Sequence, residues 1–205
     1  MEKHTSPRSQ AKRNAILDAA QQCFLEHGYS KTSMDMVAAR AGVSKATIYA
    51  HFQGKTDLFT AIIRRRCDDY SDGLSCFGQW EEQQDGRQAL LYLARHLLTF
   101  LVQPEVLAMY RMVVAESPHQ PELAQLYYEQ GPQRGRARIV DMLQQLMDRG
   151  LMPRQNPTVF AEQLTAMLRG EYFNRMLLGL PERPDLTLDN TVTMAVERLL
   201  GCVLV

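Results

Sequence analysis

One predicted short helix in this 205-residue chain begins with side chains suited to contacting nucleic acid: Lys45, Ala46, Thr47 and Tyr49. Ammonium and hydroxyl groups donate hydrogen bonds to base edges and to phosphate oxygens. The exposed N-terminal end of a helix is also where side chains reach the major groove. The chemistry that these residues indicate is therefore noncovalent recognition of double-stranded DNA.

The segment 32–52 has the form of a helix-turn-helix, with two short helices joined by a turn that contains glycine. Thr32 or Ser33 offers an N-cap for the first helix. Gly42 supplies the left-handed backbone that the turn requires, and Ser44 caps the second helix. The positions expected to face inward are apolar: Val37, Ala38, Ala41, Val43 and Ile48.

The formal charge of zero conceals two oppositely charged parts. Residues 1–66 contain eleven basic and five acidic residues, so this segment carries +6. The remainder contains twelve basic and eighteen acidic residues, giving −6, and no lysine follows Lys55. This asymmetry indicates an anionic partner for the N-terminal segment alone.

Helical periodicity dominates the sequence, and no alternating pattern of useful strand length occurs, so we expect an all-α protein with about nine or ten helices. Prolines fall at the expected helix edges, where they are tolerated. After the helix-turn-helix, a long helix is predicted from Lys55 into the stretch 73–78. The later predicted helices are 87–102, 105–116, 121–130, 134–149, 158–178 and 188–204.

Composition and the cysteines favour a cytoplasmic protein. The chain is 45% hydrophobic and 22% charged, as is typical of soluble domains, and no apolar run approaches the ~18–20 residues that span a bilayer. The first residues have no apolar core of the kind found in secretory signals. We therefore expect no membrane partner and free thiols at the four cysteines, Cys23, Cys67, Cys76 and Cys202.

Between Ala15 and Ile63 the chain resembles the TetR-type transcriptional repressors. The resemblance rests on residues at fixed spacing: Ile16-Leu17-Asp18-Ala19-Ala20, Phe24, Gly28-Tyr29, Thr32-Ser33, Val37-Ala38, Ala41-Gly42-Val43-Ser44, Thr47-Ile48-Tyr49, His51-Phe52, Lys55 and Leu58-Phe59. It implies a three-helix DNA-binding unit that a fourth helix links to a helical ligand-binding and dimerisation domain. We accordingly predict an arm and DNA-binding domain at 1–54 and the second domain at 55–205.

The resemblance also implies particular DNA contacts. Lys45 and Thr47 are similar to residues that contact bases, and Tyr49 and His51 to residues that contact phosphates. Lys55 matches a basic residue that opens the fourth helix of the family. The full predicted set is Thr32, Ser33, Ser44, Lys45, Ala46, Thr47, Tyr49, His51 and Lys55, with a basic arm of Arg8, Lys12 and Arg13.

The segments 113–118, 121–124 and 128–132 resemble the AefR-like subgroup of the same family. The family binds its ligands among the middle helices, where pockets are largely apolar with a few polar groups. The candidate lining residues here are Trp80, Phe100, Met109, Tyr110, Met112, Tyr127, Phe173 and Met176, with Arg111, Glu116, His119 and Glu171 as polar groups. Aromatic and methionine residues at helical spacing are equally typical of an ordinary core.

The last two predicted helices carry apolar positions that we expect to need a partner: Leu164, Met167, Leu168, Phe173 and Leu177, then Val192, Ala195, Val196, Leu199 and Val203. The resemblance implies a twofold homodimer through these helices. A twofold pair of DNA-binding units requires a roughly palindromic operator, with half-sites separated by a multiple of the ~34 Å helical turn.

These features predict a ligand-responsive repressor that leaves its operator when a small, hydrophobic effector binds. An activator of the same fold is the first alternative, because nothing in the sequence sets the sign of regulation. A regulator that senses oxidation through Cys67 and Cys76 is the second, although Asp68, Asp69 and Asp72 would raise the pKa of a nearby thiol.

Other classes of function find little support in the sequence. Gly-x-Ser-x-Gly, P-loop and His-Glu-x-x-His patterns are absent. The histidines are isolated from one another: His4, His27, His51, His96 and His119. We therefore expect no enzyme activity, no catalytic residues, no metal site and no cofactor. A purely structural helical module would need neither the basic segment nor the groove-reading helix.

Overall fold

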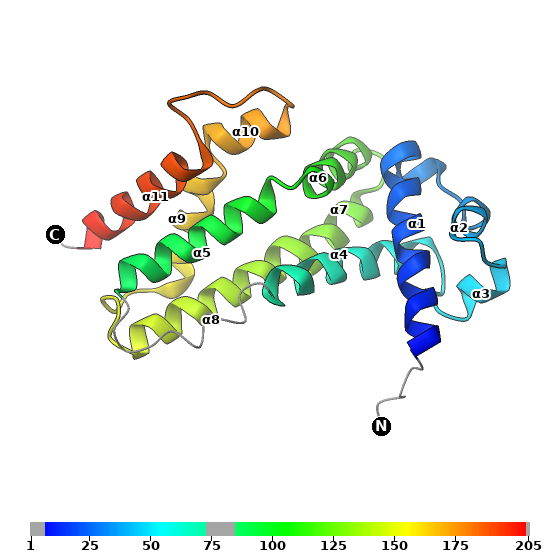
Figure 1. Cartoon of the computed structure of the whole chain (residues 1–205), viewed down its shortest axis with the longest axis horizontal. Coiled ribbons are helices and arrows are strands. Elements are labelled where there is room, and N and C mark those ends of the chain that lie inside the picture. Colours follow the sequence, from blue (N-terminus) through cyan, green and yellow to red (C-terminus); the bar gives the residue numbers. More distant parts are fainter. Residues whose placement is uncertain (1–6, 73–84, 204–205) are drawn as a thin grey trace. The chain divides into compact units, whose positions relative to one another are not determined.

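The computed structural model describes residues 7–72 and 85–203 (Figure 1). The elements are α1 (Pro7–Lys31), α2 (Met34–Ala41), α3 (Lys45–Tyr49), α4 (Lys55–Asp72), α5 (Gly86–Leu101), α6 (Pro104–Glu116), α7 (Pro121–Tyr128), the π-helical turn η2 (Glu129–Gln133), α8 (Arg134–Asp148), α9 (Pro157–Leu168), α10 (Glu171–Leu177) and α11 (Leu188–Val203). Apart from an isolated bridge between Arg183 and Leu186, the regular structure of these ranges is helical. The all-α prediction is confirmed.

Local signals in the sequence explain where the first helices begin and end. Gly28 interrupts α1 with a φ of 79°, which only glycine adopts readily. Ser33, and not Thr32, caps α2, because its hydroxyl accepts a hydrogen bond from the backbone N–H of Met36. Gly42 ends α2 in the left-handed region with a φ of 65°.

The single helix predicted over 158–178 is wrong, because the structure contains two. Asn156 caps α9 through bonds from the N–H groups of Thr158 and Val159. The break comes at Gly170, whose backbone has a ψ of −145° that no helix contains. A β-carbon there would lie 3.1 Å from the carbonyl oxygen of Met167, so the chain passes too close for a larger residue to fit without a shift.

The described residues pack into two compact units, which we call unit 1 (Met1–Arg66 and Ala108–Gly131) and unit 2 (Cys67–Leu107 and Pro132–Val205). This division differs from the predicted boundary between residues 54 and 55. The reason is that the first half of α4, the end of α6 and α7 bury their apolar side chains in one core with α1–α3. That shared core includes Ile16, Phe24, Ile48, Phe59, Ile62, Met109, Val113 and Leu123. The functional boundary at 54/55 stays a prediction.

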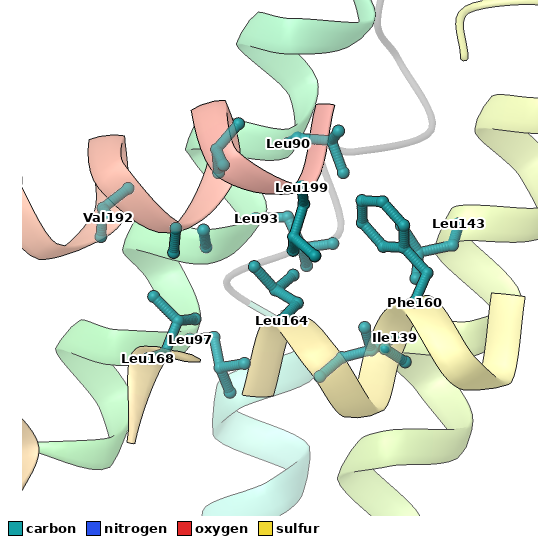
Figure 2. Packing of buried hydrophobic residues seen from close by; sticks show 14 of the residues in the cluster. Leu90, Leu93, Leu97, Ile139, Leu143, Phe160, Leu164, Leu168, Val192 and Leu199 are labelled. Carbon is teal, nitrogen blue, oxygen red and sulfur yellow. The ribbon is translucent and has the colours of Figure 1, made fainter. Parts of the chain in front are cut away.

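Unit 2 has its own core, formed by α5, α8, α9 and α11 (Figure 2). The side chains that meet there include Leu90, Leu93, Leu97, Ile139, Leu143, Phe160, Leu164, Leu168, Val192 and Leu199. Each fully buried side chain of this size contributes about 1.5–3 kcal/mol to folding.

The burial of side chains in this core removes one of the reasons to expect a dimer from the sequence. Most of the apolar residues expected to need a second chain are buried within unit 2 itself: Leu164, Leu168, Phe173, Val192, Ala195, Val196 and Leu199. An apolar stripe shows that a helix is covered, but it does not show by what.

Among the described residues, no single helix is both long and apolar enough to cross a membrane. Within residues 7–72 and 85–203, one pair of helices, α5 with α6, meets the requirements of length and composition together, and this pair is bent by 61° at its break.

Candidate DNA-binding interface

The helix-turn-helix is built from two capped helices and one left-handed glycine. Ser44 caps α3, because its hydroxyl accepts a hydrogen bond from the N–H of Thr47 at 3.1 Å. The backbone N–H of Val43 bonds to the carbonyl oxygen of Ala38 at 3.1 Å and so closes the turn after Gly42. These local bonds fix the direction in which α3 leaves α2.

Burial of one face of α3 leaves its other face exposed. Ile48 is fully buried, and Phe52 just beyond the helix is also buried, so both anchor α3 on the core of unit 1. Lys45 and Ala46 are exposed, and half of the Tyr49 side-chain surface faces solvent. The structure thus brings these predicted DNA contacts together on one outer surface.

Lys45 is oriented by a carboxylate across the turn. Its Nζ lies 2.9 Å from Oδ1 and 3.1 Å from Oδ2 of Asp35 in α2, and this pairing raises the pKa of Lys45. Both side chains are largely exposed, and exposed ion pairs are weak. A phosphate or a base acceptor can therefore replace Asp35 at little cost.

Thr47 and His51 are half-buried at the edges of the exposed face. The hydroxyl of Thr47 shares a hydrogen bond with the hydroxyl of Ser44 at 2.8 Å. The His51 ring lies 6.3 Å from the Phe52 ring, measured between centroids. Ser33 and Ser44 are exposed caps, as predicted for residues near a phosphate backbone.

Thr32 does not fit its predicted role. It is only 3% exposed, and its hydroxyl lies within hydrogen-bond distance of the carbonyl oxygens of Cys23 at 3.0 Å and Gly28 at 2.7 Å. The side chain closes the turn between α1 and α2 from inside. A buried hydroxyl whose proton is already donated cannot also reach a phosphate, so we remove Thr32 from the set of DNA contacts.

Lys55, at the start of α4, holds the end of α1. Its Nζ donates to the carbonyl oxygens of Tyr29 at 2.8 Å and Ser30 at 3.1 Å, and it lies 4.6 Å from the centre of the Tyr29 ring. Burial lowers the pKa of this ammonium group. An ammonium group has three hydrogens to donate, so a third remains for a phosphate.

The predicted basic arm belongs to the first turns of α1. Arg8 and Lys12 are exposed, and the Arg13 guanidinium lies 5.2 Å from the centre of the Phe52 ring. Arg13 is therefore held against the same core residue that anchors the end of the helix-turn-helix.

Glu116 has a different role in the structure from the one predicted from the sequence. Instead of serving as a polar group of a ligand site, its carboxylate accepts hydrogen bonds from the backbone N–H and the hydroxyl of Ser30. Gln120 donates to the same hydroxyl. The carboxylate lies so close to the α1 break that a β-carbon on Gly28 would be 3.1 Å from its Oε1. These contacts tie α6 and α7 to the turn that precedes α2.

The change Glu116→Gln should destabilise the protein by about 1 kcal/mol at pH 7, because the amide replaces an ionised acceptor of charge-assisted bonds. The hydrogen bonds from Ser30 hold the pKa of Glu116 below its usual value. A lowered folded-state pKa contributes stability above the usual carboxyl pKa of ~4.3 and loses it as the pH falls through the folded value. The difference between wild type and Glu116→Gln should therefore shrink below about pH 4.3.

Urea unfolding followed by circular dichroism at pH 7 and pH 4 measures this difference. Glu122→Gln in α7 is the matched control, since that carboxylate is exposed. A constant difference at both pH values would contradict the role of the Glu116 charge.

The candidate ligand residues fall into both units. In unit 1 the rings of Tyr110 and Tyr127 lie 6.2 Å apart. In unit 2 Phe100 contacts Tyr70, and the Arg169 guanidinium lies 5.1 Å from the centre of the Phe173 ring. The remaining candidates are Met109, Met112, Arg111 and His119 in unit 1, Glu171 and Met176 in unit 2, and Trp80, which lies outside the described residues.

Cys67 does not have the environment of a redox sensor. The thiol is buried, and burial raises its pKa. A sensor thiol needs a low pKa and access to solvent. Cys76, its proposed partner, lies outside the described residues. Across the parts of the chain that the structure describes, no group of three or more histidine, cysteine, aspartate or glutamate side chains could hold a metal ion.

The fold and the site define a helix-turn-helix protein with an additional helical unit. A family model described as "Bacterial regulatory proteins, tetR family" matches residues 16–62. A second, described as "AefR-like transcriptional repressor, C-terminal domain", matches residues 88–202. The chain belongs to the TetR family of bacterial transcriptional regulators, and the resemblance found in its sequence is confirmed.

Two solved structures resemble the chain over nearly its whole length. One, from Mesorhizobium loti MAFF303099, is described as a TetR-family regulator; it has a TM-score of 0.81 and 29% identity, covering 96% of this chain and 98% of that one. The other, the flavonoid-responsive regulator FrrA, has a TM-score of 0.74 and 30% identity. The match covers 94% of this chain and 97% of FrrA.

Two curated relatives match only part of the chain. The transcriptional activator FasR of Mycolicibacterium smegmatis is 40% identical over 63 residues, which are 31% of this chain and 29% of FasR. The transcriptional repressor BepR of Brucella suis biovar 1 is 47% identical over 53 residues, 26% of this chain and 25% of BepR. The chain therefore aligns with less than a third of the length of each.

Proposed function

We propose that the protein is a cytoplasmic repressor that binds a palindromic operator as a homodimer and leaves it when a small, apolar effector binds. The observation that carries the proposal is the outer face of α3. Lys45, Ala46 and Tyr49 are exposed there, while Ile48 anchors the helix from below.

In this proposal α3 enters the major groove. Lys45 and Thr47 donate to acceptors on base edges, and the methyl group of Ala46 contacts a thymine methyl. The phosphate backbone is bound by the flanking polar residues: Ser33, Ser44, Tyr49, His51 and Lys55. One short helix reads few bases, so specificity requires two copies on half-sites one helical turn, ~34 Å, apart or a multiple of it.

We favour repression over activation as the effect of the bound protein on transcription. The family model that matches residues 88–202 describes repressors, and BepR is a repressor as well. Activation is the second candidate, because FasR, an activator, is 40% identical to this chain over 63 residues. In transcription from a promoter that carries the bound site, a repressor lowers the transcript level and an activator raises it.

The effector is proposed to be an aromatic, mostly apolar molecule. FrrA, which is 30% identical over most of the chain, responds to flavonoids. The aromatic and methionine side chains proposed to contact the effector are those of unit 2, Phe100, Phe173 and Met176, while Tyr110, Tyr127 and Arg111 of unit 1 stay predictions from the sequence. Glu116 is left out, because its carboxylate is already bound to Ser30.

The homodimer is proposed to form through the outward faces of α9 and α11. Val159 on α9 is 46% exposed and Met194 on α11 is 68% exposed, so both helices offer apolar side chains that a second chain could cover. Sedimentation equilibrium should give twice the mass of one chain.

Selection of bound duplexes from a random pool, with the full chain, should recover a palindromic site. Lys45→Ala should then weaken binding to that site by about tenfold, because one favourable base contact is worth roughly that factor. Fluorescence anisotropy of labelled duplexes measures both the affinity and its dependence on salt.

Lys31→Ala is the matched control, since Lys31 is an exposed lysine of the same unit outside the proposed contact set. It should leave the preference for the selected site over random duplex unchanged. Recovery of no common site, or equal effects of the two substitutions, would overturn the proposed placement of α3 on DNA.

A further inference from the structure

We propose that the hydroxyl of Tyr70 is the polar anchor of the effector, and that the ligand it selects is a largely aromatic molecule with an acceptor oxygen. The proposal rests on the effector response proposed above. Tyr70 lies near the end of α4 in unit 2, and its role has no counterpart among the residues expected from the sequence.

The hydroxyl of Tyr70 is buried and lacks a described partner. The residue is 4% exposed, and its hydroxyl oxygen has no hydrogen-bond partner among the described residues. Native proteins pair nearly all their buried polar groups, because an unpaired one loses its bonds to water without replacement. An unpaired donor in a core therefore marks a place that a partner from outside the chain can fill.

Two neighbouring rings pack against the ring of Tyr70. His96 stacks on it with 4.9 Å between centroids, and Phe100 packs against it at the same distance. The Nε2 atom of His96 is also bonded to the carbonyl oxygen of Tyr70 at 2.9 Å. Tyr92 continues the stack beyond His96. These contacts hold the ring of Tyr70 among aromatic neighbours.

The surroundings select the chemistry of the ligand. Two arginines near Tyr70 share one carboxylate, since Arg138 lies 3.2 Å and Arg134 3.6 Å from Oδ1 of Asp68. Arg138 also donates to the carbonyl oxygen of Cys67 at 2.8 Å. Burial raises the pKa of Tyr70, so its phenol stays protonated and able to donate. The positive charge of Arg138 acts on the same hydroxyl in the opposite direction and lowers its pKa, so it favours an electron-rich oxygen as the partner. A carbonyl oxygen on an aromatic frame meets both conditions.

A second buried tyrosine provides a matched control. Tyr172 in α10 is 3% exposed and belongs to the same core cluster as Tyr70. Its hydroxyl is paired, because it donates to the carboxylate of Glu182. Phenylalanine at either position removes one oxygen and leaves the ring, so only the pairing of the hydroxyl differs between the two changes.

The experiment compares full-length wild type, Tyr70→Phe and Tyr172→Phe. In urea, the unfolding midpoint of Tyr70→Phe should equal or exceed that of wild type, whereas that of Tyr172→Phe should fall. Titration calorimetry then uses flavone, which carries a ring carbonyl, and flavan, which lacks it. Wild type and Tyr172→Phe should bind flavone about tenfold more tightly than flavan, and Tyr70→Phe should lose this preference.

A lower unfolding midpoint for Tyr70→Phe would overturn the inference, because the hydroxyl would then have a partner such as an ordered water. An unchanged preference for flavone in Tyr70→Phe, or no binding of either probe by wild type, would also overturn it. If flavone binds through Tyr70 but the protein stays on its operator, the proposed effector response fails while the contact stands.

Discussion

Replacing Phe59 by alanine should lower the free energy of unfolding by about 3–5 kcal/mol, the usual range for a buried phenylalanine. Phe59 in α4 is fully buried. Its ring lies 6.1 Å from that of Phe24 and 5.6 Å from that of Tyr29, both in α1, with near-perpendicular planes that add to the packing energy. The substitution opens a cavity where α1 and α4 meet in unit 1.

The cavity should also weaken binding to DNA. Tyr29 is part of the support for the turn before α2, because its carbonyl oxygen accepts from Lys55 and its hydroxyl shares a hydrogen bond with Thr56 at 3.0 Å. When Tyr29 loses the ring of Phe59 beside it, this turn is less firmly held. Urea unfolding and operator titration on the same samples measure both effects.

Tyr49→Ala is the control for Phe59→Ala. Because half of the Tyr49 side chain is exposed, its removal should change the free energy of unfolding by less than about 0.5 kcal/mol, while still reducing affinity for the operator. A loss of less than about 1 kcal/mol for Phe59→Ala would mean that the three rings do not form the core of unit 1.

The elements defined by local signals could be predicted from the sequence. A glycine with positive φ, a serine that caps and an apolar residue at the right spacing lie within a few residues of one another, and Gly42, Ser44 and Ile48 are observed as expected. The break at Gly170 could not be predicted, because glycine within an apolar helical pattern is often tolerated.

Contacts between distant residues left no signal of this kind. Ser30 and Glu116 are 86 positions apart, and neither residue type indicates the other. Thr32 and Ser33 were equivalent as caps, and only the fold shows that Thr32 turns inward to the carbonyl oxygens of Cys23 and Gly28. Tyr70 could have been any core tyrosine, since its unpaired hydroxyl exists only in the folded chain.

Replacing Gly86 by alanine should lower the free energy of unfolding by about 4 kcal/mol or more, which is an exceptionally large loss for one substitution. Gly86 is buried at the start of α5, directly after the capping residue Asp85. A β-carbon there would lie 1.8 Å from the carbonyl oxygen of Leu151 and 2.7 Å from its carbonyl carbon. No rotation of a side chain relieves a clash with backbone, so α5 or the turn after α8 must move.

The movement should disturb unit 2 as a whole. Leu90, Leu93 and Leu97 of α5 form part of its core, and His96 and Phe100 of the same helix hold the ring of Tyr70. Flavone binding should therefore be lost together with stability. Urea unfolding gives the stability, and hydrogen exchange measured on peptides from α5 and α8 shows where the protection falls.

Gly135→Ala in α8 is the control that separates the clash with Leu151 from the effect of helix propensity. Gly135 also lies in the first turn of a helix of unit 2, but a β-carbon there meets nothing within 4 Å. Alanine is the better helix former, so propensity alone would stabilise the protein in both variants, by about 0.5–1 kcal/mol. Opposite signs at the two glycines can then arise only from the contact with Leu151. A gain in stability for Gly86→Ala would mean that α5 does not begin against that carbonyl group.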